Sequence, residues 1–553
     1  MTIWLRERVP LAMGPRREGK SSMIRKLLIA LALFLPSAAQ AQWHEATSNN
    51  FIVFSQGSEQ DARDFAAKLE RFHYVLRTFH RINAAQSPNK LRVFLLSSAG
   101  DVGRMIGSSS AAGYYVPDAR ARMLVGTRAR GSRGSGDPRS ARSQVDLDPE
   151  SILLHEYTHH FMYQYFPATY PTWYSEGFAE FWGATRFLPG DVVEVGLPAD
   201  HRFATFRALG WLPLNRMLTA HNYSEARGWN VFLLYAEGWL LVRYAFEHPE
   251  RQRQLQQYLS LINSGVTYEN AMRQAFPDLD RLDSDLFSYA GTGRFNVIRL
   301  PFRTIDVGQI AVRTLRPAEQ ALIEHEIKLS QGIQQREAAA IATEIRTIAG
   351  RFPDDPFALG VLMEAERLAG NGAAATAAAD RLLAINPNHA RALATKGLVQ
   401  VAALRAASSA DRAQWDAARA LFIRASRIAE NDPVVLEAYY DSFTAQGVTP
   451  PDGAQNALYR AMELAPSDGE LRYKLALDFE QRNLIREAIA IIRPEAFSTP
   501  HRDDESEGER RRRERDEERF RQAGRERHET AREMFVRLER KLAESPPQAA
   551  NAN

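Results

Sequence analysis

The 553-residue sequence contains no cysteine. Disulfide bonds, a cysteine nucleophile, thiolate metal ligands and a lipid-modified N-terminal cysteine are therefore excluded. The sequence also has little excess of charge of either sign, because 70 basic and 67 acidic residues leave a formal net charge of +3. This balance gives no reason to expect nucleic acid as a partner. After residue 35 no run approaches the ~20 consecutive apolar residues of a transmembrane helix, so we expect no integral membrane segment in the mature chain.

The first 41 residues have the features of a secretory signal peptide. The basic pair Arg25-Lys26 precedes a short apolar run, and Ala39-Gln40-Ala41 supplies the small residues of a cleavage site. We therefore predict a signal peptide over 1–41 that starts at Met23. The protein is then exported, periplasmic or secreted in a Gram-negative-type bacterium, and a short membrane anchor is the alternative.

The residues that follow predict an α+β region. Strand-like runs cover 51–54, 91–96 and 113–125, the last with a turn near Pro117, and an amphipathic helix covers 61–83. A helix over 148–165 is expected to begin at Asp148, whose carboxylate can accept hydrogen bonds from the first turn, with Pro149 in the first helical position. A shorter helix is predicted over 172–182.

The C-terminal part is rich in alanine and shows an internal repeat. Pro353, Pro387, Pro433 and Pro466 each lie between helices, at separations of 34, 46 and 33 residues. A period of 34 residues for helix pairs is typical of tetratricopeptide repeats, and the longer separation predicts a 12-residue insertion around 406–414. A generic alanine-rich helical bundle is the alternative.

Five segments follow from these patterns. We predict a signal peptide over 1–41, an α+β domain over 42–300, a linker with a lead-in helix over 301–350, repeats over 351–496, and a charged helix with a disordered tail over 497–553.

The segment 154–160, LHEYTHH, contains the motif H-E-x-x-H on the predicted helix. Residues at i and i+4 lie on one face of a helix, so His155 and His159 can direct ring nitrogens at one metal ion. Glu156 lies about 100° around the helix, where it can reach a metal-bound water as a general base.

A third protein ligand is needed, since a catalytic zinc site has three protein ligands and a water. The segment WYSEGFAEF offers Glu176, 17 positions after His159 and across a proline-broken turn. Glu180 lies one helical turn further on the same face, where it can accept the free N–H of a ligand histidine. Two imidazoles and one carboxylate suit Zn²⁺. The neighbouring His160 points away and is expected to be a packing residue.

HEYTHH followed by WYSEGFAEF resembles the gluzincin zinc peptidases, and in particular the peptidase MA-like family. The resemblance implies a zincin-like fold over residues 43–290, zinc bound by His155, His159 and Glu176, and Glu156 as the base. It also implies a downstream tyrosine that stabilises the oxyanion, for which Tyr235 is the candidate. The gap between the two motifs is shorter than in aminopeptidase-type gluzincins and no G-A-M-E-N segment is present, which favours an endopeptidase.

The sequence thus predicts an exported zinc metallopeptidase with a zincin-like α+β domain, followed by an all-α tetratricopeptide-repeat solenoid. A peptide or protein would be the substrate, and a partner protein could occupy the groove of the repeats. The strand ending near Val125 could pair with an extended substrate through its edge. The alternative is a catalytically degenerate zincin that acts as a protein-binding scaffold in the cell envelope.

Overall fold

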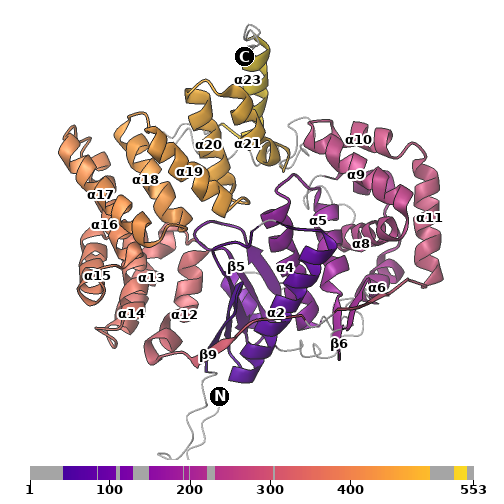
Figure 1. Cartoon of the computed structure of the whole chain (residues 1–553), viewed down its shortest axis with the longest axis horizontal. Coiled ribbons are helices and arrows are strands. Elements are labelled where there is room, and N and C mark those ends of the chain that lie inside the picture. Colours follow the sequence, from indigo (N-terminus) through magenta and orange to yellow (C-terminus); the bar gives the residue numbers. More distant parts are fainter. Residues whose placement is uncertain are drawn as a thin grey trace, which may run out of the picture. The chain divides into compact units, whose positions relative to one another are not determined.

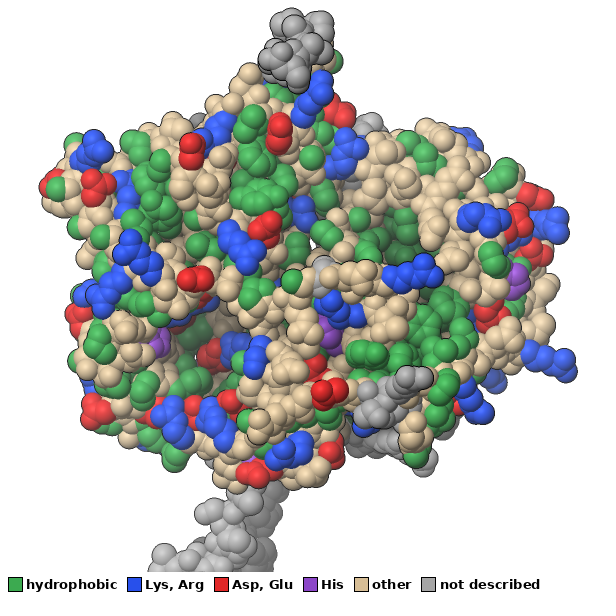
Figure 2. Space-filling model, viewed as in Figure 1, with side chains coloured by type: hydrophobic (Ala, Val, Ile, Leu, Met, Phe, Trp, Pro, Cys, Tyr) green, Lys and Arg blue, Asp and Glu red, His purple; other side chains and the backbone are tan. Residues whose placement is uncertain are grey.

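A computed structural model describes residues 42–83, 85–106, 112–128, 148–190, 192–198, 200–220, 231–302, 305–498 and 529–544. The predicted signal peptide lies outside these ranges, as does most of the predicted charged tail. Among the helices within them, none combines the length and the apolar character that crossing a bilayer requires. On the face drawn in Figure 2, basic and acidic side chains are interspersed, in keeping with the nearly balanced charge.

The N-terminal region is built on a six-stranded mixed sheet with the order β4-β5-β3-β2-β1-β9. Three central strands, β2, β3 and β5, are parallel, and the other three are antiparallel to their neighbours. The strands are β1 (His44–Thr47), β2 (Phe51–Ser55), β3 (Leu91–Leu96), β4 (Gly113–Val116), β5 (Met123–Thr127) and β9 (Ala311–Thr314).

Both faces of this sheet are covered. Along β3, Val93 and Leu95 face one apolar core, whereas Phe94 and Leu96 face another, as the two-residue period of a strand requires. The first core contains α2 (Glu59–Phe79) and α4 (Pro149–Tyr165), and the second contains α3 (Ala99–Ile106) and α12 (Pro317–Ser330) (Figure 1).

A second, three-stranded antiparallel sheet and a group of helices complete the α/β region. The strands of this second sheet are β6 (Arg186–Leu188), β7 (Val192–Val195) and β8 (Ile298–Pro301). The helices are α5 (Thr172–Gly183), α6 (Asp200–Leu209), α7 (Leu214–Thr219), α8 (Val231–Glu247), α9 (Pro249–Asn263), α10 (Tyr268–Ala275) and α11 (Leu279–Thr292).

The described residues from 317 onwards form an all-helical, repeat-like region in which consecutive helices pack in pairs (Figure 1). After α12 and α13 (Gln335–Ala349) come four pairs, and α23 packs on the last of them through Met534, Phe535 and Leu538. The elements are α14 (Pro356–Leu368), α15 (Gly372–Ile385), α16 (Ala390–Ala406), α17 (Arg412–Ile428), α18 (Pro433–Gln446), α19 (Asp452–Leu464), α20 (Gly469–Gln481), α21 (Ile485–Ser498) and α23 (Ala531–Glu544).

The repeats and the segment before them differ from the sequence-based expectation in two places. The extra residues around 406–414 lengthen the helices on both sides of this position, since α16 and α17 have 17 residues each while α14 and α15 have 13 and 14. The expected linker 301–350 contains β9, which pairs with β1 through Ala46 and Val312. The chain therefore returns to the first sheet before the repeats begin.

Candidate metal centre

The helix α4 carries both histidines of the motif and lies against the sheet. It begins at Asp148 with Pro149 in its first turn. No hydrogen bond from the first-turn amides reaches the Asp148 side chain, so that part of the expectation is wrong. Packing holds the helix instead, because Leu153 fills the space beside Gly126 of β5, where a Cβ atom would lie 2.4 Å from Leu153 Cδ2.

The helix α5 brings the third residue to the site, and glycines allow its close approach. A Cβ atom on Gly177 would lie 2.3 Å from the carbonyl carbon of Gly238 in α8, and one on Gly238 would lie 2.2 Å from the carbonyl oxygen of Trp173. A Cβ atom on Gly183 would lie 3.0 Å from the Cβ of His155. The position of Glu176 is therefore fixed by glycine contacts to the helices on both sides.

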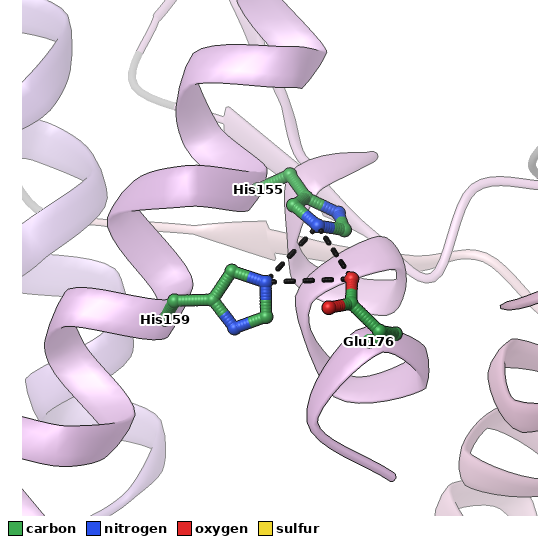
Figure 3. A group of neighbouring side chains, drawn as sticks. All are labelled: His155, His159 and Glu176. Carbon is green, nitrogen blue, oxygen red and sulfur yellow. Dashed lines mark hydrogen bonds and ion pairs between the residues drawn. The ribbon is translucent and has the colours of Figure 1, made fainter. Parts of the chain in front are cut away.

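The side chains of His155, His159 and Glu176 converge from these two helices (Figure 3). The two Nε2 atoms are 3.2 Å apart, and Glu176 Oε2 lies 3.1 Å from Nε2 of His155 and 3.5 Å from Nε2 of His159. Tetrahedral zinc with bonds of about 2.0–2.1 Å requires ligand atoms about 3.3–3.4 Å apart. The spacing and the donor types therefore fit a zinc ion bound by these three residues.

The charges around this group also favour a cation. Burial lowers the pKa of His155, but the hydrogen bond to Glu176 and the charges of Glu180, Glu176 and Glu156 outweigh it and raise the pKa to about 9. Burial raises the pKa of Glu176, yet His159 and His155 bring it well below its ordinary value. Three carboxylates thus surround two imidazoles, and only 7% of the Glu176 surface is exposed.

Glu156 lies beside the two histidines and close to the edge of the sheet. Burial raises the pKa of its carboxyl group, and the charges of His155 and His159 oppose this. A Cβ atom on Gly113 of β4 would lie 3.4 Å from Glu156 Cγ. A carboxylate whose basicity is raised, next to the candidate ligands, is the arrangement that proton transfer from a water requires.

Glu180 faces the far side of the His155 ring. Its Oε1 lies 3.7 Å from Nδ1 of His155, which is within ion-pair range but longer than a hydrogen bond. The same carboxylate pairs with Arg202 of α6, and both side chains are nearly buried. Arg202 was not anticipated from the sequence, because a single arginine on a separate, later helix carries no spacing signal.

Two predicted residues, Tyr235 and His160, lie outside the candidate ligand set. The Arg202 guanidinium carbon is 4.9 Å from the centre of the Tyr235 ring, so Tyr235 is one side chain removed from Glu180. Its role with an oxyanion stays a prediction. His160 packs away from the other two histidines, with Nδ1 3.0 Å from the Tyr115 hydroxyl, and burial lowers its pKa well below the ordinary value.

Comparison with known proteins gives a match among solved structures. No protein-family model matches the sequence, and no curated protein matches it. Among solved structures, a thermophilic TPR protein from Thermus thermophilus is 21% identical, with a TM-score of 0.25. The match covers 28% of this chain and 80% of that one. The metal site is therefore interpreted from its own residues and geometry.

Proposed function

We propose that this chain is a zinc-dependent metallopeptidase that hydrolyses internal peptide bonds. The observation that carries the proposal is the spacing of the three ligand atoms, 3.1 Å, 3.2 Å and 3.5 Å, in a buried group with Glu156 beside it. All three separations lie close to the edge of a zinc tetrahedron, and the three atoms come from residue types that zinc prefers.

Each residue has a defined task in this proposal. His155, His159 and Glu176 hold the ion, which when bound polarises the substrate carbonyl and acidifies a water. Glu156 accepts a proton from the attacking water on its carboxylate and passes it to the leaving amine nitrogen. Glu180 orients the His155 ring through Nδ1, which keeps Nε2 as the ligand atom.

An extended substrate can form backbone hydrogen bonds with an edge strand of the first sheet. The strand ending near Val125, β5, is paired with β3 on one side and β4 on the other, so the expectation that it offers a free edge is wrong. Among the described strands β4 forms the edge of the sheet on this side, and Gly113 brings it against Glu156. We infer that β4 pairs with the backbone of the substrate next to the metal.

The test combines metal analysis with cleavage of an unfolded protein. Purified protein should contain one zinc per chain and should lose its activity to a chelator. Glu156→Gln should keep zinc and lose turnover by at least 1000-fold, whereas His155→Ala should lose both. His160→Gln is the matched control, because it removes an adjacent imidazole that faces Tyr115, and it should keep zinc.

Two outcomes would count against the peptidase. Wild-type rates in Glu156→Gln would contradict the assigned mechanism. Zinc retention without any cleavage by the wild type would instead favour the non-catalytic scaffold, in which the repeats bind a partner protein. Export of the chain is a further part of the proposal, and it rests on the sequence features of residues 1–41.

A further inference from the structure

The tip of the β4–β5 hairpin, residues 117–122, contacts the repeats through the buried Ala119, while Pro117, Asp118 and Arg120 around it are exposed. Ala119 is 9% exposed and belongs to the same apolar cluster as Leu436 and Tyr440 of α18 and Leu471 of α20. Its backbone N–H donates a hydrogen bond to Asp468 Oδ2, at 2.9 Å. The turn of this hairpin thus reaches from the N-terminal sheet to the helical region, where Ala119 is shielded from water by apolar side chains of α18 and α20.

A second anchor, Arg122, connects the repeats to the metal-binding helix. Its guanidinium group donates to the carbonyl oxygen of Leu464 at the end of α19, at 2.7 Å, and to Gln164 Oε1 of α4, at 2.9 Å. Hydrogen bonds to Ser87 and to the carbonyl of Asn89 complete its surroundings. Because the planar guanidinium group donates hydrogen bonds to α4, to α19 and to the segment 87–89 at once, it fixes the relative positions of these three segments.

The hairpin tip presents charges of both signs to the face that it meets: Arg120 attracts Glu437 and Glu470, whereas burial and the charges of Asp468 and Glu470 raise the pKa of Asp118. Burial raises the pKa of Glu437 on α18, and the charges of Lys474 and Arg120 are among those that oppose this. Burial raises the pKa of Glu470 on α20, but Lys474 and, to a smaller extent, Arg120 outweigh it and lower the pKa. Because α18 and α20 are the first helices of successive pairs, the tip lies on a surface that helical repeats use to bind other segments.

The docked hairpin leads directly to the candidate active site. Ser467, in the loop before α20, hydrogen-bonds to Tyr115 of β4 and donates to the carbonyl oxygen of Pro117, at 3.4 Å. The Tyr115 hydroxyl in turn lies 3.0 Å from Nδ1 of His160, which is adjacent to His159. The edge strand β4 is therefore held between the metal-binding helix and the last repeats.

We propose that the segment bound by the last two repeats is the chain's own β4–β5 hairpin, and that this docking fixes β4 as the edge on which substrate is bound. The catalytic consequence rests on the proposed peptidase function, but the docking itself does not. An external peptide that used the same surface would have to displace residues 117–122 and would loosen β4.

Two variants should disrupt the docking of the hairpin on the repeats without changing a candidate metal ligand. Ala119→Asp places a carboxylate next to Asp468, which already accepts from the N–H of residue 119, in a site of 9% exposure. Asp468→Ser is milder, because serine can still cap α20, where Asp468 Oδ1 accepts from Glu470 and Leu471, but one hydroxyl cannot also reach Ala119. Asp411→Ser is the matched control, since Asp411 caps α17 in the same way without contacting the hairpin.

The measurement is hydrogen exchange of residues 113–127 in the full-length protein, together with zinc content and kcat/KM on an extended peptide. Ala119→Asp should speed exchange in β4 at least tenfold and Asp468→Ser at least threefold, with zinc content unchanged. The value of kcat/KM should fall about fivefold to tenfold, mainly through KM. Asp411→Ser should match the wild type in every readout.

Unchanged exchange over 113–127 in Asp468→Ser and in Ala119→Asp would overturn the docking, whatever the catalytic result. If Ala119→Asp fails to fold, Asp468→Ser decides alone. Faster exchange with an unchanged kcat/KM would overturn the role of the dock in substrate binding. Absence of cleavage by the wild type would count against the peptidase alone, because exchange reports the docking without any need for activity.

Discussion

The helices of the candidate metal site and four helices of the repeats begin in different ways. In the repeats, α14, α17, α18 and α20 begin at aspartates whose side chains accept hydrogen bonds from the first-turn amides, namely Asp355, Asp411, Asp432 and Asp468. The site helices α4 and α5 begin at Asp148 and Pro171, without any such side-chain bond. Their positions come from contacts with Gly126, Gly183 and the pair Gly177–Gly238.

This difference separates local from tertiary control. A capped helix is specified within about four residues, so a repeat can be formed and placed by its own sequence and its neighbours. A helix of the site packs against helices and strands that are distant in the sequence. Small residues where two helices cross determine how closely their backbones approach. Added volume at Gly177 or Gly238, which face backbone atoms of another helix, should therefore be less tolerated than at Gly397 of the repeats, which faces the side chain of Phe422.

Adding one methyl group at this crossing is expected to have the largest effect. Gly177→Ala would place a Cβ atom 2.3 Å from the backbone of α8, which neither helix can avoid without moving. We expect the free energy of unfolding to fall by about 3 kcal/mol and zinc affinity to fall at least 100-fold. Urea unfolding and competition with a chromophoric chelator would measure the two.

The matching change in the repeats should have the opposite sign. Gly360 lies inside α14, and a Cβ atom there would meet no other atom within 4 Å. Gly360→Ala should leave zinc affinity unchanged and raise stability by up to about 1 kcal/mol, since alanine loses less entropy in a helix. Equal effects of the two substitutions would show that the crossing at Gly177 is not tight.

The buried pair of Glu180 and Arg202 is expected to matter next. Their side chains are 10% and 11% exposed, so Glu180→Ala leaves a nearly buried arginine unpaired as well as removing the group that faces His155. We expect a loss of about 3 kcal/mol in stability and a 10–100-fold loss in zinc affinity. Isothermal titration with zinc would detect the second effect.

An exposed pair in the repeats supplies the contrast. Glu463 and Arg460 of α19 are 42% and 45% exposed, and Glu463→Ala should change stability by less than about 0.5 kcal/mol. If Glu180→Ala binds zinc as tightly as the wild type does, Glu180 has no role in orienting the His155 ring.

The same division explains what the sequence can predict. His155, His159 and Glu176 could be proposed together because the first two share a helical period and the third follows in a recognisable second motif. The repeat helices could be placed from the spacing of prolines and the pattern of alanines. Both signals are local, because each is carried by a short stretch of chain.

The remaining features depend on pairings between distant residues. Ala46 of β1 pairs with Val312 of β9, and no local pattern in the expected linker indicates that partner. The choice of β4 rather than β5 as the edge depends on the order of the whole sheet. Arg202 reaches Glu180 from another helix, and the docking of Ala119 on α18 and α20 brings together residues more than 300 positions apart.

Buried histidines under the site should make the α/β region more acid-sensitive than the repeats. Burial lowers the pKa of His80 from 6.5 to about 4, in a pocket of Phe161, Phe178 and Trp182. The unfolded chain then binds more protons, so this contribution is complete above pH 6.5 and is lost as the pH falls towards 4. Between pH 7.5 and 5.0 the loss is about 2 kcal/mol.

His80→Phe isolates this contribution, because phenylalanine does not titrate. The stability of the variant should fall by about 2 kcal/mol less than that of the wild type between pH 7.5 and 5.0. The comparison with the wild type is needed because burial raises the pKa of Glu237 to about 9, which favours folding at low pH and opposes the histidines. An identical pH dependence for both proteins would contradict the assignment to His80.

The smallest expected effect concerns the helix starts themselves. Asp411 Oδ1 accepts from the amides of Ala413 and Gln414, at 2.9 Å and 3.4 Å, whereas the Asp148 side chain accepts no first-turn amide. Asp411→Ala should therefore cost about 1 kcal/mol, while Asp148→Ala should cost only a few tenths, through the helix dipole. Urea unfolding of each variant gives the difference. If Asp148→Ala costs as much as Asp411→Ala, the metal helix depends on its own first turn, and the contrast between locally held repeats and a tertiary-held site fails at α4.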